Sequence, residues 1–276
     1  MVSGFDSPSP IAFALDFPNV DEARAAASQV ASAIGMLKVG LELFIHAGPS
    51  VVALGRELDL PVFLDLKLHD IPETVERAVA QASHLGARAV TVHASGGKKM
   101  LERAVARAKS EGGTLDVCAV TILTSLDDTD LDDVGIHVTR RLPAFRPSEG
   151  GHVIESVPER PRTSFAAESL ARLAYDAGVR WFVCSAEEVA ILRERLGPEA
   201  TLVTPGIRPA AAARGDQKRV ATPTRAIHDG SNWLVVGRPI RDAADRLAAA
   251  QALAREAIDA RGARAGSSAA DMGASK

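Results

Sequence analysis

Short apolar runs alternate along this chain with longer, alanine-rich segments in which apolar positions recur every three or four residues. The short runs have the length of buried strands, and the longer segments have the period of helices with one apolar face. We predict strands at residues 11–15, 36–39, 62–66, 89–92, 116–122, 181–184, 201–203 and 233–236. We predict helices at residues 20–33, 49–57, 73–85, 98–109, 165–177, 186–196, 222–228 and 242–260.

A strand followed by a helix occurs eight times in this pattern, which is typical of parallel βαβ units. We therefore predict an α/β protein with a single (β/α)8 TIM barrel over residues 1–262. The rival architecture is a doubly wound open sheet. Nucleotide-binding sheets of that class carry G-x-G-x-x-G after the first strand, whereas this chain has Asp16-Phe17-Pro18-Asn19 there.

Two segments fit neither period. Residues 140–162 are rich in Pro, Arg, Gly and Glu, and we predict an inserted surface loop after the fifth strand; a lid or a subunit contact is the alternative. Residues 263–276 are rich in Gly, Ala and Ser. We expect this tail to be disordered, because it offers little apolar surface to offset the entropy of ordering.

Composition narrows the class of protein. A hydrophobic content of 46% supports a large core, and a formal net charge of −3 gives no basic footprint for nucleic acid. No apolar stretch reaches the roughly 18 residues that a membrane helix needs, and the start lacks a signal-peptide pattern, so we expect a soluble, cytoplasmic protein. Cys118 and Cys184 lack metal-site spacing, and we expect both to be reduced and buried.

The most informative stretch is Phe63 to Pro72, which places charged groups on an otherwise apolar strand. Side chains alternate along a strand, so Asp65 and Lys67 share one face and the leucines between and beside them take the other. Asp70 follows the strand. Burying such charges costs several kcal/mol per ion unless close opposite charges and hydrogen bonds offset the loss of hydration. A functional array is therefore one interpretation, and an internal salt bridge that fixes the strand end is the other.

Polar residues follow other strands of the predicted barrel as well. In this fold the catalytic residues sit at the carboxyl ends of the strands. There the chain has Asp16 after the first strand, Lys38 on the second, and Thr124 and Ser125 after the fifth. Each alone could cap a helix or close a salt bridge, but together with the third strand they form an acid and base array.

The last two strands are followed by loops suited to phosphate. They are 204–208 (Thr-Pro-Gly-Ile-Arg) and 236–240 (Val-Gly-Arg-Pro-Ile). Glycine lets backbone N–H groups approach an anion, Arg208 and Arg238 add charge, and these positions are the recurrent phosphate site of the fold. Turn glycines beside solvated arginines are the alternative. Between the loops, the polar segment 214–219 could close over a bound phosphate.

These residues resemble the orotidine 5′-phosphate decarboxylase family, in a type 1-like form with an insert. Its D-x-K-x-x-D motif is similar to Asp65-Leu66-Lys67-Leu68-His69-Asp70, and the likeness covers Ile11 to about Ala250. Further similar stretches are Ala-Leu-Asp-Phe at 14–17, Leu-Lys-Val-Gly at 37–40, Thr-Val-His-Ala at 91–94, Thr-Ile-Leu-Thr-Ser at 121–125 and Val-Cys-Ser at 183–185. The insert at 140–162 departs from the short linker of the family but removes no motif residue.

The resemblance implies decarboxylation of orotidine 5′-monophosphate to UMP, the last step of de novo pyrimidine synthesis, without cofactor or metal. It implies that Lys67 stabilises the carbanion at C6 and then protonates it, and that Asp65, Lys38 and Asp70 complete the catalytic array. The implied substrate contacts are Asp16, Lys38, Asp70, Ile71, Thr74, Thr124 and Ser125. The implied phosphate contacts are Arg208, Gln217, Gly237 and Arg238.

The resemblance also implies a homodimer in which Asp70, Ile71 and Thr74 reach the neighbouring active site. Two rival functions remain. One is a Mg²⁺-dependent phosphosugar lyase or aldolase of the same superfamily, which shares D-x-K-x-x-D. The other is a barrel that binds a phosphorylated metabolite as a sensor or scaffold. The residues flanking the motif, His-Asp-Ile-Pro-x-Thr, favour the decarboxylase over the first.

Overall fold

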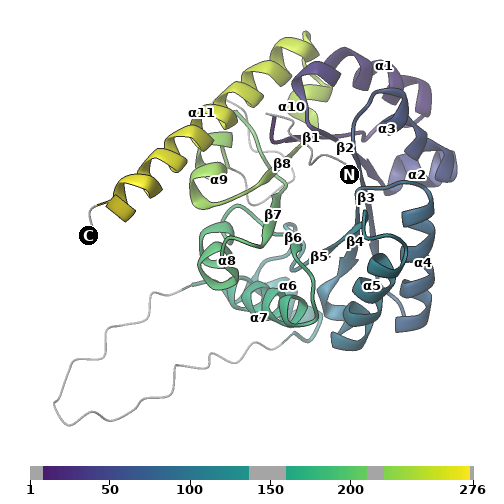
Figure 1. Ribbon diagram of the computed structural model, residues 1–276, viewed down its shortest axis with the longest axis vertical. Helices are drawn as coiled ribbons and strands as arrows, with labels where there is room; N and C mark the ends of the chain where they lie inside the picture. Colours follow the sequence, from purple (N-terminus) through teal and green to yellow (C-terminus); the bar gives the residue numbers. More distant parts are fainter. Residues whose placement is uncertain (1–8, 137–159, 210–220, 274–276) are drawn as a thin grey trace.

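The computed structural model of the protein describes residues 9–136, 160–209 and 221–273. Its strands are parallel, pair in sequence order and close into a barrel through the pairing of the first with the last (Figure 1). This confirms the predicted (β/α)8 barrel. The strands are β1 (Ile11–Ala14), β2 (Met36–Gly40), β3 (Val62–Leu68), β4 (Ala89–His93), β5 (Asp116–Val120), β6 (Trp181–Val183), β7 (Thr201–Thr204) and β8 (Trp233–Val236).

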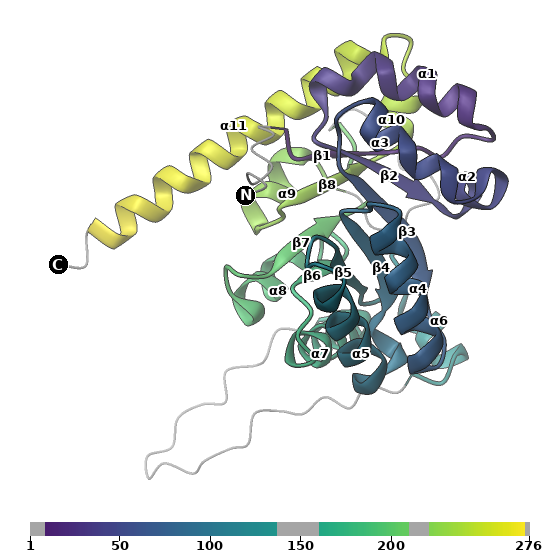
Figure 2. The same ribbon diagram turned by 45° about the vertical axis from the view of Figure 1, so that its right-hand side comes forward.

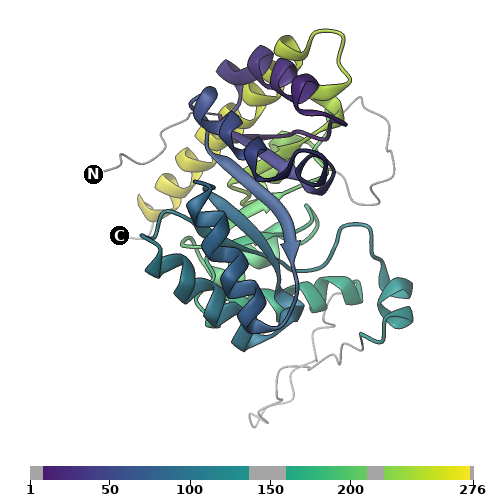
Figure 3. The same ribbon diagram turned by 90° about the vertical axis from the view of Figure 1, so that its right-hand side faces the viewer.

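Helices surround the barrel and connect its strands. They are α1 (Val20–Val30), α2 (Leu41–Ala47), α3 (Leu54–Glu57), α4 (Pro72–His84), α5 (Lys98–Ser110), α6 (Asp128–Asp133), α7 (Arg162–Asp176), α8 (Val189–Leu196), α9 (Pro223–Asp229), α10 (Arg238–Arg241) and α11 (Arg246–Gly273). Three short 3₁₀ helices, η1 (Ala31–Ala33), η2 (Gly48–Ala53) and η3 (Ala94–Gly96), complete them. Neighbouring helices pack on each other, as α4 and α5 do outside β3 and β4 (Figure 3).

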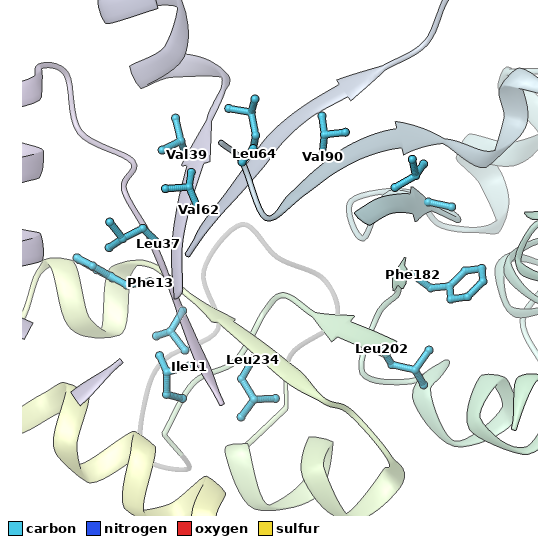
Figure 4. Packing of buried hydrophobic residues seen from close by; sticks show 14 of the residues in the cluster. Ile11, Phe13, Leu37, Val39, Val62, Leu64, Val90, Phe182, Leu202 and Leu234 are labelled. Atoms are coloured by element: carbon cyan, nitrogen blue, oxygen red, sulfur yellow. The ribbon is translucent and has the colours of Figure 1, made fainter. Parts of the chain in front are cut away.

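The apolar side chains form two cores that follow the alternation along each strand. Outward side chains such as Phe13, Leu37 and Leu234 pack against the helices (Figure 4). Inward side chains fill the interior of the barrel, where Phe63 and Trp181 lie with Cys118. The interior of a TIM barrel is thus filled with side chains, and an active site has room only at the carboxyl ends of the strands. Both cysteines are free and buried, as predicted.

Three short helices, α2, α6 and α10, were not predicted. The predicted helix 49–57 is divided into η2 and α3, while α2 begins directly after β2. Helix α6 begins at a capping box: the Asp127 carboxylate accepts the backbone N–H groups of Thr129 and Asp130, and the Asp130 carboxylate accepts that of Asp127. Such reciprocal capping satisfies donors that a helix start leaves free.

Helix α7 begins at Arg162, earlier than the predicted start at residue 165, because α6 caps it. The carboxylate of Asp128 accepts the backbone N–H groups of Arg162 and Thr163, each at 2.9 Å. Of the predicted inserted loop, 140–162, residues 140–159 lie outside the described residues.

Helix α11 continues through residues 263–273 of the predicted tail, and its last turns extend away from the barrel (Figure 2). The helix was expected to end at residue 260. Alanine and arginine, which dominate its sequence, are among the best helix formers, so low apolar content alone did not prevent helix formation. At its start α11 packs against α1 and α10, and it also contacts α9.

Candidate active site

The carboxyl ends of the strands surround a cavity of about 550 Å³. Side chains that follow or end β1, β2, β3, β5, β7 and β8 line it, so residues far apart in the sequence meet there. Among the predicted site residues, those that line the cavity are Asp16, Lys38, Asp65, Lys67, Thr124, Arg208, Gly237 and Arg238.

Acidic and basic side chains alternate along one wall of the cavity. The Nζ of Lys38 lies 3.1 Å from Oδ1 of Asp16 and 3.7 Å from Oδ2 of Asp65. The Nζ of Lys67 lies 2.8 Å from Oδ1 of the same Asp65. These contacts form a continuous chain, Asp16–Lys38–Asp65–Lys67, with Asp65 shared by both lysines. Because β1, β2 and β3 are neighbours in the barrel, strand order alone brings the four side chains together.

The shared carboxylate is stabilised in its charged form. The side chain of Asp65 is only 15% exposed. Burial alone would raise its pKa, but the charges of Lys38 and Lys67 and hydrogen bonds from Lys67 and Thr91 outweigh burial, so the pKa lies below its ordinary value. The wall therefore carries a fixed negative charge between two cations.

The backbone of β3 is irregular at the charged residues. Lys67 has a φ of +50°, in the left-handed region that costs a non-glycine residue about 1–2 kcal/mol. The pairing of β3 with β4 shifts register between Leu64 and Leu68. Even so, Asp65 and Lys67 both face the cavity, while Leu64, Leu66 and Leu68 pack in the outer core, as the alternation predicted.

Another part of the cavity lining consists of the two loops predicted to bind phosphate. Gly206 has a φ of +80°, a conformation that suits glycine, and the backbone of Arg208 pairs with that of Ala221. After β8, Gly237 precedes the short helix α10, whose first residue is Arg238. The predicted contact Gln217 and the predicted lid segment 214–219 lie outside the described residues.

Four predicted residues do not line the cavity of their own chain. Ser125 is exposed, and so are Asp70, Ile71 and Thr74, which stand at the start of α4. The Asp70 carboxylate accepts the backbone N–H of Ile71 at 2.6 Å, and the side chain of Ile71 is 65% exposed. Helix α4 begins at Pro72, one residue before the predicted start, and its N-cap residue is Ile71.

The cavity also has charged residues that the sequence reasoning missed. Arg241 lines it, donates from Nη1 to the backbone carbonyl of Asp16 at 3.1 Å, and pairs with Asp242. Glu42, in the first turn of α2, lines it as well. A usable signal existed for Arg241, because it stands three residues after Arg238 and so falls on the same face of a helical turn.

Among the residues that the structure describes, no cluster of three or more His, Cys, Asp or Glu side chains is arranged to hold a metal ion. Within the same ranges, none of the helices combines the length and apolar character required to span a bilayer.

Known proteins match this chain over most of its length. Residues 9–144 and 152–253 match the model of the orotidine 5′-phosphate decarboxylase / HUMPS family. A relative named orotidine 5′-phosphate decarboxylase, from Anaeromyxobacter sp. (strain K), is 48% identical over 244 residues, which make up 88% of this chain and 96% of the relative. One of the same name from Thermobifida fusca is 45% identical over 249 residues, 90% of this chain and 95% of the relative.

A solved structure supports the same relationship. The crystal structure of orotidine 5′-phosphate decarboxylase from Lactobacillus acidophilus superposes with a TM-score of 0.72 at 33% sequence identity. The superposition covers 90% of this chain and 99% of that one.

Proposed function

The chain belongs to the orotidine 5′-phosphate decarboxylase / HUMPS family, and from this premise we propose how its barrel decarboxylates orotidine 5′-monophosphate to UMP. Membership confirms the resemblance inferred from the motifs. The reaction is that of a carbon–carbon lyase in pyrimidine biosynthesis. The observation that carries our proposal is the position of the Lys67 ammonium, 2.8 Å from Asp65 in a cavity that the two phosphate loops also line.

Lys67 is the residue that stabilises the carbanion formed in this reaction. When the bond between C6 and the carboxylate breaks, CO₂ leaves and the electron pair stays on C6, where the pyrimidine ring delocalises it poorly. A fixed cation beside C6 lowers the energy of that state. In many enzymes such electrostatic stabilisation is the largest single contribution to the rate enhancement. The same ammonium then transfers its proton to C6, giving UMP, and the resulting amine regains a proton from water.

Asp65 and Lys38 set the electrostatics around that cation. Asp65 holds Lys67 through a charged hydrogen bond and faces the departing carboxylate, so like charges favour its loss. Lys38 balances Asp65 and Asp16 and, with Asp16, binds the ribose. The 3.1 Å and 3.7 Å contacts of Lys38 support this bridging role. Thr124 and Ser125 contribute further substrate contacts after β5.

The phosphate of the substrate binds at the loops after β7 and β8, through Arg208, Gly237 and Arg238, which line the cavity, and through Gln217. Binding energy from this remote group can be used to orient the reacting end of the substrate. The loops after the seventh and eighth strands are the recurrent phosphate site of the fold, which supports the assignment.

The active unit in this proposal is a homodimer to which Asp70 of each subunit contributes in the partner's site. Two observations support it. Asp70, Ile71 and Thr74 are exposed and do not line the cavity of their own chain. In addition, Leu41 and Ile45 on α2 are exposed apolar side chains, and α2 follows the strand next to β3, at the same end of the barrel.

Two other functions are distinguished by one experiment. Purified protein is given orotidine 5′-monophosphate in EDTA and, in parallel, with Mg²⁺, and UMP formation is followed. Equal, rapid turnover in both arms is expected from a decarboxylase that needs neither metal nor cofactor. Turnover only with Mg²⁺ would indicate the metal-dependent branch of the superfamily. Binding of UMP without turnover in either arm would indicate a sensor or scaffold.

A further inference from the structure

The ladder between β3 and β4 opens where the catalytic residues stand. Leu64 pairs with Val90, and the next pair is Leu68 with Val92. Three residues of β3, Asp65, Leu66 and Lys67, therefore stand opposite a single residue of β4. A bulge of this kind leaves backbone groups of the longer strand without their usual ladder partners and redirects side chains.

Thr91 is the residue of β4 that faces this bulge. Its neighbours Val90 and Val92 pack in the outer core, so alternation directs Thr91 to the barrel interior, where it is fully buried. Its Oγ1 accepts the backbone N–H of Lys67 at 2.7 Å and donates to Oδ1 of Asp65 at 3.1 Å.

The direction of both hydrogen bonds is fixed by chemistry. A backbone N–H can only donate, so the Thr91 oxygen must accept from Lys67. Its own hydrogen is then free for the carboxylate of Asp65, which can only accept when ionised. One hydroxyl thus links the backbone of the proposed proton donor to the carboxylate that holds the ammonium of that donor. The link also supports the left-handed backbone of Lys67.

We propose that Thr91 is a positioning residue of this active site: its hydroxyl replaces the missing ladder partner of Lys67 and fixes the Lys67–Asp65 pair in the cavity. The inference rests on the proposed role of Lys67. It extends that role to a residue of a different strand, one that does not line the cavity and has no contact with substrate in the proposal.

The test compares three variants at position 91. Thr91→Val keeps the shape and removes the hydroxyl, Thr91→Ser keeps the hydroxyl, and Thr91→Ala leaves room for water if the valine variant does not fold. We expect Thr91→Val to lower kcat by about 100-fold, the cost of misplacing a catalytic group by roughly 1 Å, with a smaller change in KM. Thr91→Ser should restore kcat to near that of the unmodified enzyme.

A second readout does not depend on turnover. Losing a hydrogen bond to the charged form raises the pKa of a carboxylic acid. In an NMR titration of the side-chain carboxyl groups, the Asp65 pKa should rise in Thr91→Val and return in Thr91→Ser. A hydroxyl that only stabilises the barrel would lower the melting temperature without moving this titration.

The matched control is Ser231→Ala. Ser231 is also buried, and its hydroxyl donates to the backbone carbonyls of Leu202 and Trp233 rather than to the acid and base array. It should lose stability while keeping kcat and the Asp65 titration. Loss of turnover in Lys67→Ala with unchanged kcat and titration in Thr91→Val would overturn this inference alone. Full turnover in Lys67→Ala would instead overturn the proposed function.

Discussion

The ammonium of Lys67 lies 2.8 Å from the carboxylate of Asp65, two residues earlier on the same strand. Side chains at i and i+2 share a face of a strand, so this contact follows from local geometry. Asp65 also lies 3.7 Å from Lys38, which comes from the neighbouring strand. The carboxylate is thus held from two sides, and the consequences for activity and stability can be measured separately.

Replacing Lys67 tests the proton donor. Lys67→Ala should abolish turnover almost completely, because both the cation beside C6 and the transferred proton are lost. The thermal unfolding profile should stay close to that of the unmodified protein, since the side chain is 31% exposed. Steady-state UMP formation and circular dichroism check both statements. The control is Lys99→Ala, because Lys99 is an exposed lysine on α5. Activity near the unmodified level in Lys67→Ala would remove Lys67 from the mechanism.

The pH dependence of stability reports on Asp65. Its folded-state pKa is lower than the ordinary 3.8, so the folded protein binds fewer protons there than the unfolded chain. The stabilisation is complete above pH 3.8 and is lost as the pH falls through the lower folded-state value. Asp65→Asn should cost about 1–3 kcal/mol at neutral pH, the range for losing a charged hydrogen bond. In urea unfolding, the gap between the two proteins should narrow in acid; a constant gap would contradict the assignment.

A methyl group at position 40 should disturb the array from another side. A Cβ built on Gly40 would lie 2.9 Å from Nζ of Lys38, so the ammonium has to move. Gly40→Ala should lower kcat between about 10- and 100-fold, as expected for a small displacement of a catalytic group. Gly262→Ala is the control, because a Cβ there meets no atom within 4 Å. Unchanged kcat in Gly40→Ala would mean that Lys38 has freedom to shift without consequence.

Replacing Arg238 tests the proposed contact with the substrate phosphate. Arg238→Ala should weaken substrate binding by about 1–3 kcal/mol, the range for a hydrogen bond to a charged group, and leave the fold intact. Orotidine, which lacks the phosphate, should react equally slowly with both proteins. Arg225→Ala, an exposed arginine of α9 that pairs with Asp229, should behave like the unmodified enzyme. A wild-type kcat/KM in Arg238→Ala would refute the phosphate contact.

Mixed dimers test the contribution of Asp70 to the partner's site. Lys67→Ala and Asp70→Ala should each be nearly inactive alone. In a symmetric dimer, random mixing of the two makes about a quarter of the sites complete, since half of the dimers are mixed and each has one intact site. Activity should therefore reappear on mixing. The double variant mixed with Lys67→Ala cannot complement and serves as control. Absence of recovery, with subunit exchange verified, would contradict the shared site.

The amino-acid sequence by itself determined the barrel and the residues of its acid and base array. Eight alternations of short apolar runs with helix-period segments predict parallel βαβ units. Four charged residues on three neighbouring strands stand out because burying charge is costly. The short motif at residues 65–70 then identified the family. Local order was harder to predict: the capping box at Asp127 was present in the sequence but overlooked, and the alanine-rich tail proved to be helical to Gly273.

Only the tertiary structure decided how these residues meet. That Arg241 reaches the backbone of Asp16, 225 positions earlier, depends on closure of the barrel through β8 and β1. The role inferred for Thr91 depends on the register between β3 and β4, which is set by packing around the whole barrel rather than by either strand. A sequence pattern fixes which face of a strand a side chain takes, because that follows from local backbone geometry. It does not fix which atoms of another strand lie opposite.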